Sequence, residues 1–129
     1  MYGRTNTINI MIKLYTSFLI LFILLNSAYS QTTTISYTCK GLSNFEILGT
    51  PGVKEEMKEI TYDFINGFLQ DLNNIECNWS NKIITCESTF LNFRKLNIDQ
   101  GLLKVTDFIS GNKGFGQYVE NFTGDCKVK

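Results

Sequence analysis

The chain of 129 residues contains no histidine, and it has only one proline and one tryptophan. Without histidine it cannot build a Ser-His-Asp or Cys-His catalytic arrangement, a histidine pH switch or the usual ligand sets of zinc enzymes. The acidic residues show no calcium-loop spacing and no pair of carboxyl groups in unlike surroundings. The sequence therefore favours a protein that is not an enzyme and that holds neither a cofactor nor a metal.

An excess of positive charge is also missing. Basic and acidic residues number 12 each, but Arg4 and Lys13 precede residue 31 and every acidic residue follows it. Residues 31–129 thus carry 10 basic and 12 acidic groups, a net charge of −2. Nucleic-acid binders usually carry a concentrated basic surface, so nucleic acid is not an expected partner.

Long apolar runs are scarce, and the one present covers residues 14–25, directly after Lys13. Twelve residues are fewer than the roughly 20 that a membrane-spanning helix needs. A basic residue followed by a short apolar run is typical of a secretory signal peptide. Met11 offers an alternative start that shortens the segment before the run.

The end of this signal is marked by small residues. Ala28 and Ser30 stand third and first before a cleavage point at Gln31. We therefore expect residues 1–30 to be removed and residues 31–129 to form one secreted, extracellular domain with no membrane span.

Four cysteines, Cys39, Cys77, Cys86 and Cys126, follow the signal. An even number in a small secreted domain predicts two disulfides, which four cysteines can form in three pairings. Residues 75–87 are typical of a hairpin that turns at residues 81–82, and this register faces Cys77 with Cys86 at a closely spaced position. A Cys77–Cys86 bridge leaves Cys39–Cys126 to tie the two ends of the domain.

The same register separates the side chains of the hairpin onto two faces. Trp79 shares a face with Cys77, and Asn78 lies on the other. Asn78 begins an Asn-Trp-Ser triplet and Asn121 an Asn-Phe-Thr triplet, both of which are N-glycosylation acceptors. We expect both asparagines on the surface of a glycoprotein.

For residues 52–73 the sequence predicts one long amphipathic helix. Thr50 and Pro51 suit its first positions, and apolar residues recur every three or four positions from Val53 to Leu72. We expect an α+β fold in which this helix packs on an antiparallel sheet that contains a 75–93 hairpin. A mostly α fold with one hairpin is the alternative, and residues 94–129 suit either a short helix or a second hairpin.

Function is only broadly indicated. The prediction is a small disulfide-bonded binding protein with an extracellular protein partner. The alternative is a carrier of a small apolar ligand or lipid, for which Trp79, Phe64 and Phe68 are the candidate contacts.

Overall fold

The computed structural model describes the backbone of residues 4–26 and 31–129, and the side chains of residues 7–21 and 31–129. Contacts divide the chain into a unit of residues 1–32 and a unit of residues 33–129. The first unit contains α1 (Arg4–Asn26). No helix in the described part of the chain combines the length and apolar character needed to cross a membrane. The expected cleavage site at Ala28 and Ser30 lies outside the described residues.

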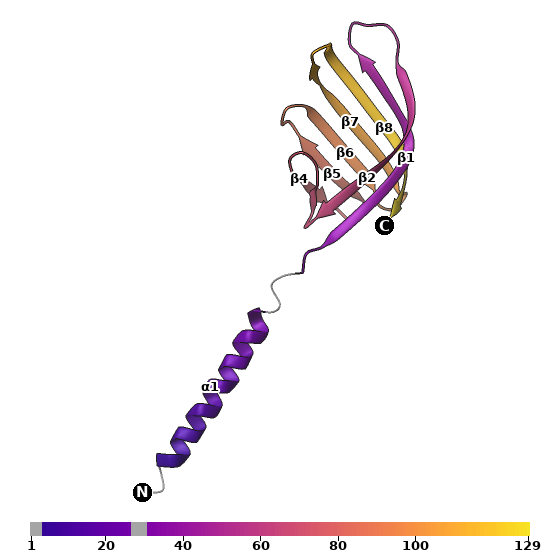
Figure 1. The fold of residues 1–129 in the computed structure, drawn as a ribbon. Coiled ribbons are helices and arrows are strands. Elements are labelled where there is room, and N and C mark those ends of the chain that lie inside the picture. Colours follow the sequence, from indigo (N-terminus) through magenta and orange to yellow (C-terminus); the bar gives the residue numbers. More distant parts are fainter. Residues whose placement is uncertain (1–3, 27–30) are drawn as a thin grey trace. The chain divides into compact units, whose positions relative to one another are not determined.

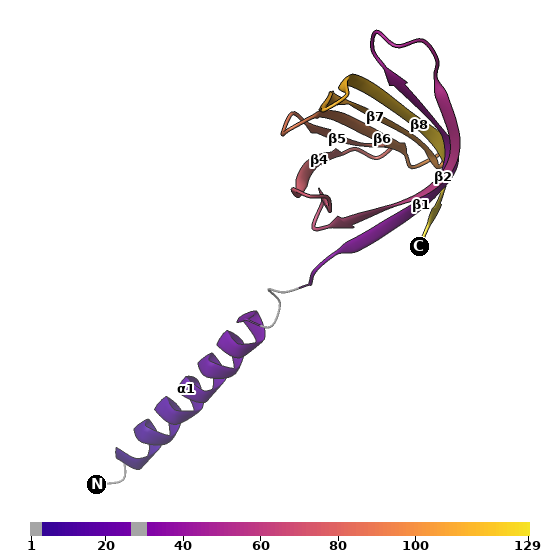
Figure 2. The ribbon, with the colours of Figure 1, turned by 45° about the horizontal axis from the view of Figure 1, so that its top comes forward.

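The second unit, residues 33–129, is an antiparallel barrel of eight strands (Figures 1 and 2). Each strand pairs with the next along the chain, and the last returns to the first, which closes the barrel. The strands are β1 (Thr34–Ile47), β2 (Lys54–Ile65), β3 (Phe68–Leu69), β4 (Ile75–Trp79), β5 (Ile83–Ser88), β6 (Phe93–Asp99), β7 (Lys104–Lys113) and β8 (Gly116–Val128).

The predicted helix over residues 52–73 is wrong, and so are both fold classes built on it. This segment forms β2, β3 and the turn between them at Asn66 and Gly67. Both turn residues have positive φ, 51° and 83°, as a type I′ turn, one of the two common two-residue turns of β-hairpins, requires. Asn-Gly is a strong hairpin signal, and here it outweighs the helical spacing of the neighbouring apolar residues.

The 75–93 segment does form a hairpin, and its register is the predicted one. Cys77 faces Cys86 and Trp79 faces Ile84 across β4 and β5. The second strand ends at Ser88 rather than continuing to residue 93. Residues 94–129 contain no helix; they form β6, β7 and β8, so the second-hairpin alternative is correct for them.

Both disulfides join neighbouring strands of the barrel. Cys77–Cys86 links β4 to β5. Cys39–Cys126 links β1 to β8 at the place where the barrel closes. The pairing is the one favoured from the hairpin register.

The two ends of the barrel have different interiors. We call the end with the connections 48–53, 70–74, 89–92 and 114–115 the mouth, and the opposite end the base. The β1–β2 hairpin extends beyond the other turns at the mouth (Figures 1 and 2). Toward the base the inward side chains form a compact apolar core that includes Tyr37, Phe64, Ile84, Leu96, Ile98 and Phe122.

Candidate functional site

Toward the mouth, the inward-facing positions change from apolar to charged. On β2 the side chains at alternate positions turn from Phe64 and Tyr62 near the base to Lys58 nearer the mouth. On β6 and β8 the corresponding inward positions are Arg94 and Glu120. Eight-stranded barrels either fill their interior with side chains or leave room for one small ligand. These polar residues lie at the mouth-facing end of the apolar core.

Arg94 and Asp107 form the centre of a buried polar network. The Nε and Nη2 atoms of Arg94 donate to the two carboxylate oxygens of Asp107 at 3.1 and 2.8 Å. The hydroxyl of Tyr62 donates to the same carboxylate at 3.0 Å. Only 4% of Asp107 is exposed, so this two-point contact is held away from water.

The network shifts the titration of its members. Burial alone would lower the pKa of Arg94, but the hydrogen bonds and negative charge of Asp107 raise it above the ordinary value. Burial raises the pKa of Tyr62, and the nearby Asp107 carboxylate raises it further. Tyr62 is therefore a neutral donor and Arg94 a permanent cation.

The remaining edge of Arg94 carries a second acidic partner. Its Nη1 atom donates to Asp71, which lies on the 70–74 connection rather than on a strand. The side chain of Asp71 is 37% exposed, against 4% for that of Asp107. One carboxylate is thus fixed inside the barrel, and the other reaches Arg94 from a partly exposed loop.

A second polar cluster is formed by residues of β8, β1 and β2. Glu120 accepts a hydrogen bond from Ser43 and an ion-paired hydrogen bond from Lys58, each at 2.8 Å. Burial would raise the pKa of Glu120, but Lys58 and Ser43 together lower it below the ordinary value. The hydrogen bond with Glu120 raises the pKa of Lys58. Both groups are charged at neutral pH.

A cavity of about 360 Å³ opens between the two clusters at the mouth. This volume is at the low end of the roughly 300–1,000 Å³ typical of small-molecule sites. Arg94, Asp71, Lys113 and Glu120 supply its charged lining. Its apolar lining includes Ile75, Phe90, Leu91, Ile109 and Tyr118. A second hollow of about 310 Å³, along the inner side of the β1–β2 hairpin, also borders Glu120.

Tyr118 and Lys113 line one side of the cavity, and further aromatic rings pack on Tyr118. The ring of Tyr118 stacks on Phe45 with the centroids 5.6 Å apart, and Phe115 lies 6.2 Å from both. The Nζ atom of Lys113 lies 4.8 Å from the Tyr118 centroid, which is within reach of a cation–π interaction.

The rim of the mouth is apolar. Each of its four connections exposes at least one large apolar side chain: Leu48, Val53, Leu72, Phe90, Leu91 and Phe115. At the three connections of the base, only Leu102 is exposed in this way among the described residues. Water-facing apolar groups concentrated around a polar cavity are typical of a binding surface.

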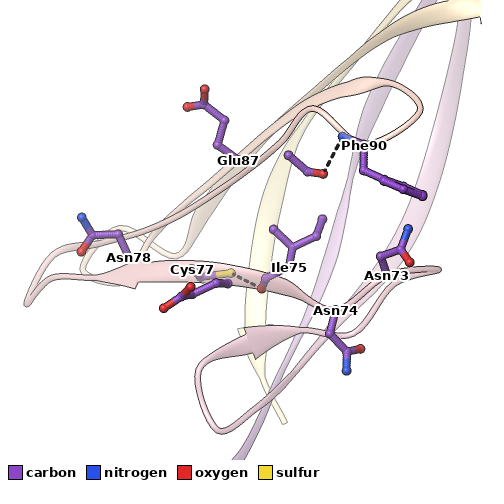
Figure 3. Close-up of a pocket in the computed structure, with 9 residues that line it drawn as sticks. Asn73, Asn74, Ile75, Cys77, Asn78, Glu87 and Phe90 are labelled. Atoms are coloured by element: carbon purple, nitrogen blue, oxygen red, sulfur yellow. Dashed lines mark hydrogen bonds between the residues drawn. The ribbon is translucent and has the colours of Figure 1, made fainter.

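A larger hollow, about 850 Å³, lies on the wall of the barrel between β4 and β5 (Figure 3). The pairing of these strands ends at Cys77 and Cys86, and toward the mouth they diverge. Ile75 lies between the diverging strands, whereas Glu87 and Asn74 point outward (Figure 3). Because Ile75 and Phe90 border both this hollow and the mouth cavity, the gap forms a side opening next to the cavity.

The aromatic residues predicted to contact a ligand lie near the base instead. Trp79 packs edge-to-face on Phe64 at 5.1 Å, and its indole N–H donates to the carbonyl of Gly67 at 3.0 Å. Both line a hollow of about 410 Å³ beside residues 33–35. Phe68 faces outward and is not part of it. The structure therefore brings two of the three together, as part of the packing at the base.

The glycosylation acceptors lie on the outside of the barrel. Asn78 on β4 and Asn121 on β8 are both exposed. Sequence reasoning missed the polar residues of the mouth, which come from different strands. One signal was available: Arg94 is the only arginine after residue 30, in a segment that otherwise uses lysine. Arginine is preferred wherever a carboxylate must be held at two points.

The charged groups of the two clusters are paired with one another in ion pairs. No group of three or more His, Cys, Asp or Glu side chains in the described ranges is placed to hold a metal ion. Arg94 and Lys58, on opposite walls of the interior, each contact a carboxylate. No protein-family model, no curated protein and no solved structure matches the chain.

Proposed function

We propose that this protein is a small binding protein that holds a ligand in the mouth cavity of the barrel. The observation that carries the proposal is the cavity of about 360 Å³, which has a charged floor and an apolar rim. A domain of this size gains stability from filling its interior, so an unfilled space at one end lowers the stability of the fold. A role in ligand binding explains why such a space is present.

The proposal includes secretion. The two disulfides are consistent with an extracellular protein, because such bonds persist in oxidising compartments. The exposed positions of Asn78 and Asn121 suit N-linked glycans, which require outward-facing asparagines. Neither acceptor lines the mouth cavity itself, whereas Asn78 borders the hollow of the side opening.

The test is binding of N-phenyl-1-naphthylamine, a neutral apolar probe whose fluorescence rises in apolar surroundings. We expect the probe to bind and Ile109→Trp to weaken binding by about tenfold or more, because the larger ring fills the cavity that Ile109 lines. Phe108→Trp is the matched control, because Phe108 directly precedes Ile109 on β7 and the alternation of the strand places it on the outer face, against Phe93. An unchanged affinity in Ile109→Trp would contradict the proposal.

An extracellular protein partner is the second candidate. The exposed apolar side chains of the rim favour it, because such a surface suits contact with another protein. The two candidates differ in what native mass spectrometry would show. A carrier retains an adduct of small mass that leaves on denaturation, whereas a protein-binding surface leaves the purified chain at its own mass.

A further inference from the structure

We propose that the mouth cavity takes a small apolar carboxylate, whose carboxylate group replaces Asp71 on Arg94. This inference rests on the proposed function, because it names the class of ligand for the same cavity. It also assigns a role to the 70–74 connection as a part of the wall that the ligand displaces.

The first step is the fixed position of Arg94. Asp107 grips two of its nitrogen atoms, and Tyr62 holds Asp107 in turn. The Nη1 edge of the guanidinium is left for a further acceptor, and Arg94 itself lines the cavity. A planar cation with one edge fixed and one edge at the cavity presents a preformed site for a carboxylate oxygen.

The second step is the weak attachment of Asp71. Its loop follows β3, a strand of two residues that forms only two residue pairs with each neighbour. The carboxylate of Asp71 is partly exposed, and it also accepts a hydrogen bond from the backbone N–H of Leu72 at 2.7 Å. When it leaves Arg94, it can be solvated at once, so its release costs little.

The third step is the charge that remains. Without Asp71, Arg94 keeps the carboxylate of Asp107 on its Nε and Nη2 atoms, but its Nη1 atom loses its carboxylate partner. A ligand with one negative charge replaces the anion that Asp71 supplies in the free protein. A neutral ligand would leave Asp71 in place and gain nothing from Arg94.

The fourth step is the shape of the rest of the ligand. Ile75, Phe90 and Ile109 line the cavity beside Arg94, and Tyr118 lines it next to Lys113. These side chains suit an aliphatic or aromatic body attached to the carboxylate. The limited volume favours a short chain or a ring system over a long lipid.

The experiment compares octanoate with 1-octanol, two probes of equal chain length that differ in charge, as competitors of N-phenyl-1-naphthylamine on the full chain. We expect octanoate to compete about tenfold better than 1-octanol, because only octanoate gains a charge-assisted contact with Arg94. Asp71→Asn removes the internal competitor and should strengthen octanoate binding by roughly two- to fivefold, without changing that of 1-octanol.

Glu55→Gln is the matched control, since it changes the net charge equally on the exposed outer face of β2. It should leave both affinities within about twofold of the original. Equal competition by the two probes, or an octanoate affinity that Asp71→Asn does not raise, would overturn the inference and leave the cavity as a site for neutral ligands. Failure of the naphthylamine itself to bind would instead contradict the proposed function.

Discussion

Individual charged residues determine what the interior of this barrel can do. A buried ion pair such as Arg94–Asp107 adds little net stability, because desolvation of the two charges offsets their attraction. Its value lies in orientation: two contacts from Arg94 and one from Tyr62 allow Asp107 a single arrangement. The pair therefore fixes the direction in which the Nη1 atom of Arg94 points, and a lysine at the same position would not be fixed in this way.

The Glu120–Lys58 pair gives a pH dependence whose sign can be stated. The folded-state pKa of Glu120 lies below its ordinary value, so its stabilising contribution is present above that ordinary value and is lost as pH falls through the folded pKa. The pKa of Lys58 is raised, so its contribution is present at neutral pH and is lost only as pH rises through that higher pKa.

We therefore expect Glu120→Gln to lower the free energy of unfolding by about 1 kcal/mol at pH 7, because the pair is partly exposed and screened by solvent. The difference between the two proteins should shrink as pH falls below the ordinary glutamate pKa and should disappear below the folded pKa of Glu120, where both proteins carry a neutral side chain. Urea unfolding at a series of pH values from 7 downward measures it. If the difference in free energy of unfolding persisted unchanged at low pH, the negative charge of Glu120 would not be the source of the stabilisation.

At the level of elements, local signals explain which predictions from the sequence succeeded. The β4–β5 hairpin was predictable because Cys77 and Cys86 lie nine residues apart and fit one register. The mouth cavity was not, because Tyr62 reaches Asp107 from a strand that does not pair with it, 45 residues away, and Asp71 reaches Arg94 from a loop 23 residues away. The single arginine was visible in the sequence, but its partners were not.

Strand β2 shows why the helix prediction failed. A half-buried strand normally alternates apolar and polar residues, but here Lys58 points inward near the mouth and Met57 points outward. This inversion removed the period of two, and the remaining apolar residues happened to fit a period of three to four. Met57 and Leu72, which the helix prediction placed on its apolar face, are among the most exposed large apolar side chains of the barrel.

The Gly67→Ala substitution tests this element, because a helix and a turn predict changes of opposite sign in the free energy of unfolding. In a helix, Gly→Ala would stabilise by about 1 kcal/mol. In the β2–β3 turn, where Gly67 has a φ of 83°, the same change should destabilise by about 1–2 kcal/mol, because a side chain is strained in that conformation. A Cβ atom would also lie 3.4 Å from the indole nitrogen of Trp79.

Gly114, in the β7–β8 turn, is the matched control. A Cβ atom there meets nothing within 4 Å, and its φ lies outside the left-handed range, so Gly114→Ala should change stability by less than about 0.5 kcal/mol. Chemical unfolding of the two variants measures the contrast. If Gly67→Ala stabilised the protein, the assignment of Gly67 to the β2–β3 turn would be contradicted.

For the barrel as a whole, closure depends on the pairing of the first and last strands. β1 and β8 form a ladder of eleven residue pairs, from Tyr37–Val128 to Ile47–Tyr118, between segments that lie far apart in the chain. Such contacts carry a large loop-closure entropy, so the barrel cannot rely on local hairpins alone. Cys39–Cys126 joins these strands covalently, with a sequence separation of 87 residues, against nine for Cys77–Cys86.

The two disulfides should therefore differ in their effect on stability. In the chain-entropy model, loops of these lengths correspond to about 4.6 kcal/mol for Cys39–Cys126 and about 2.7 kcal/mol for Cys77–Cys86. We expect Cys39→Ala with Cys126→Ala to lower the free energy of unfolding by more than Cys77→Ala with Cys86→Ala does. Urea unfolding followed by the fluorescence of Trp79, the only tryptophan, measures both.

The short loop has a second role that separates the two bridges further. Cys77–Cys86 lies where β4 and β5 diverge beside the mouth cavity, so its loss should widen the side opening and weaken binding of N-phenyl-1-naphthylamine even while the barrel stays folded. Loss of Cys39–Cys126 should weaken probe binding only in proportion to the fraction of unfolded chains. Equal stability costs, together with equal effects on the probe, would mean that neither barrel closure nor the side opening governs this fold.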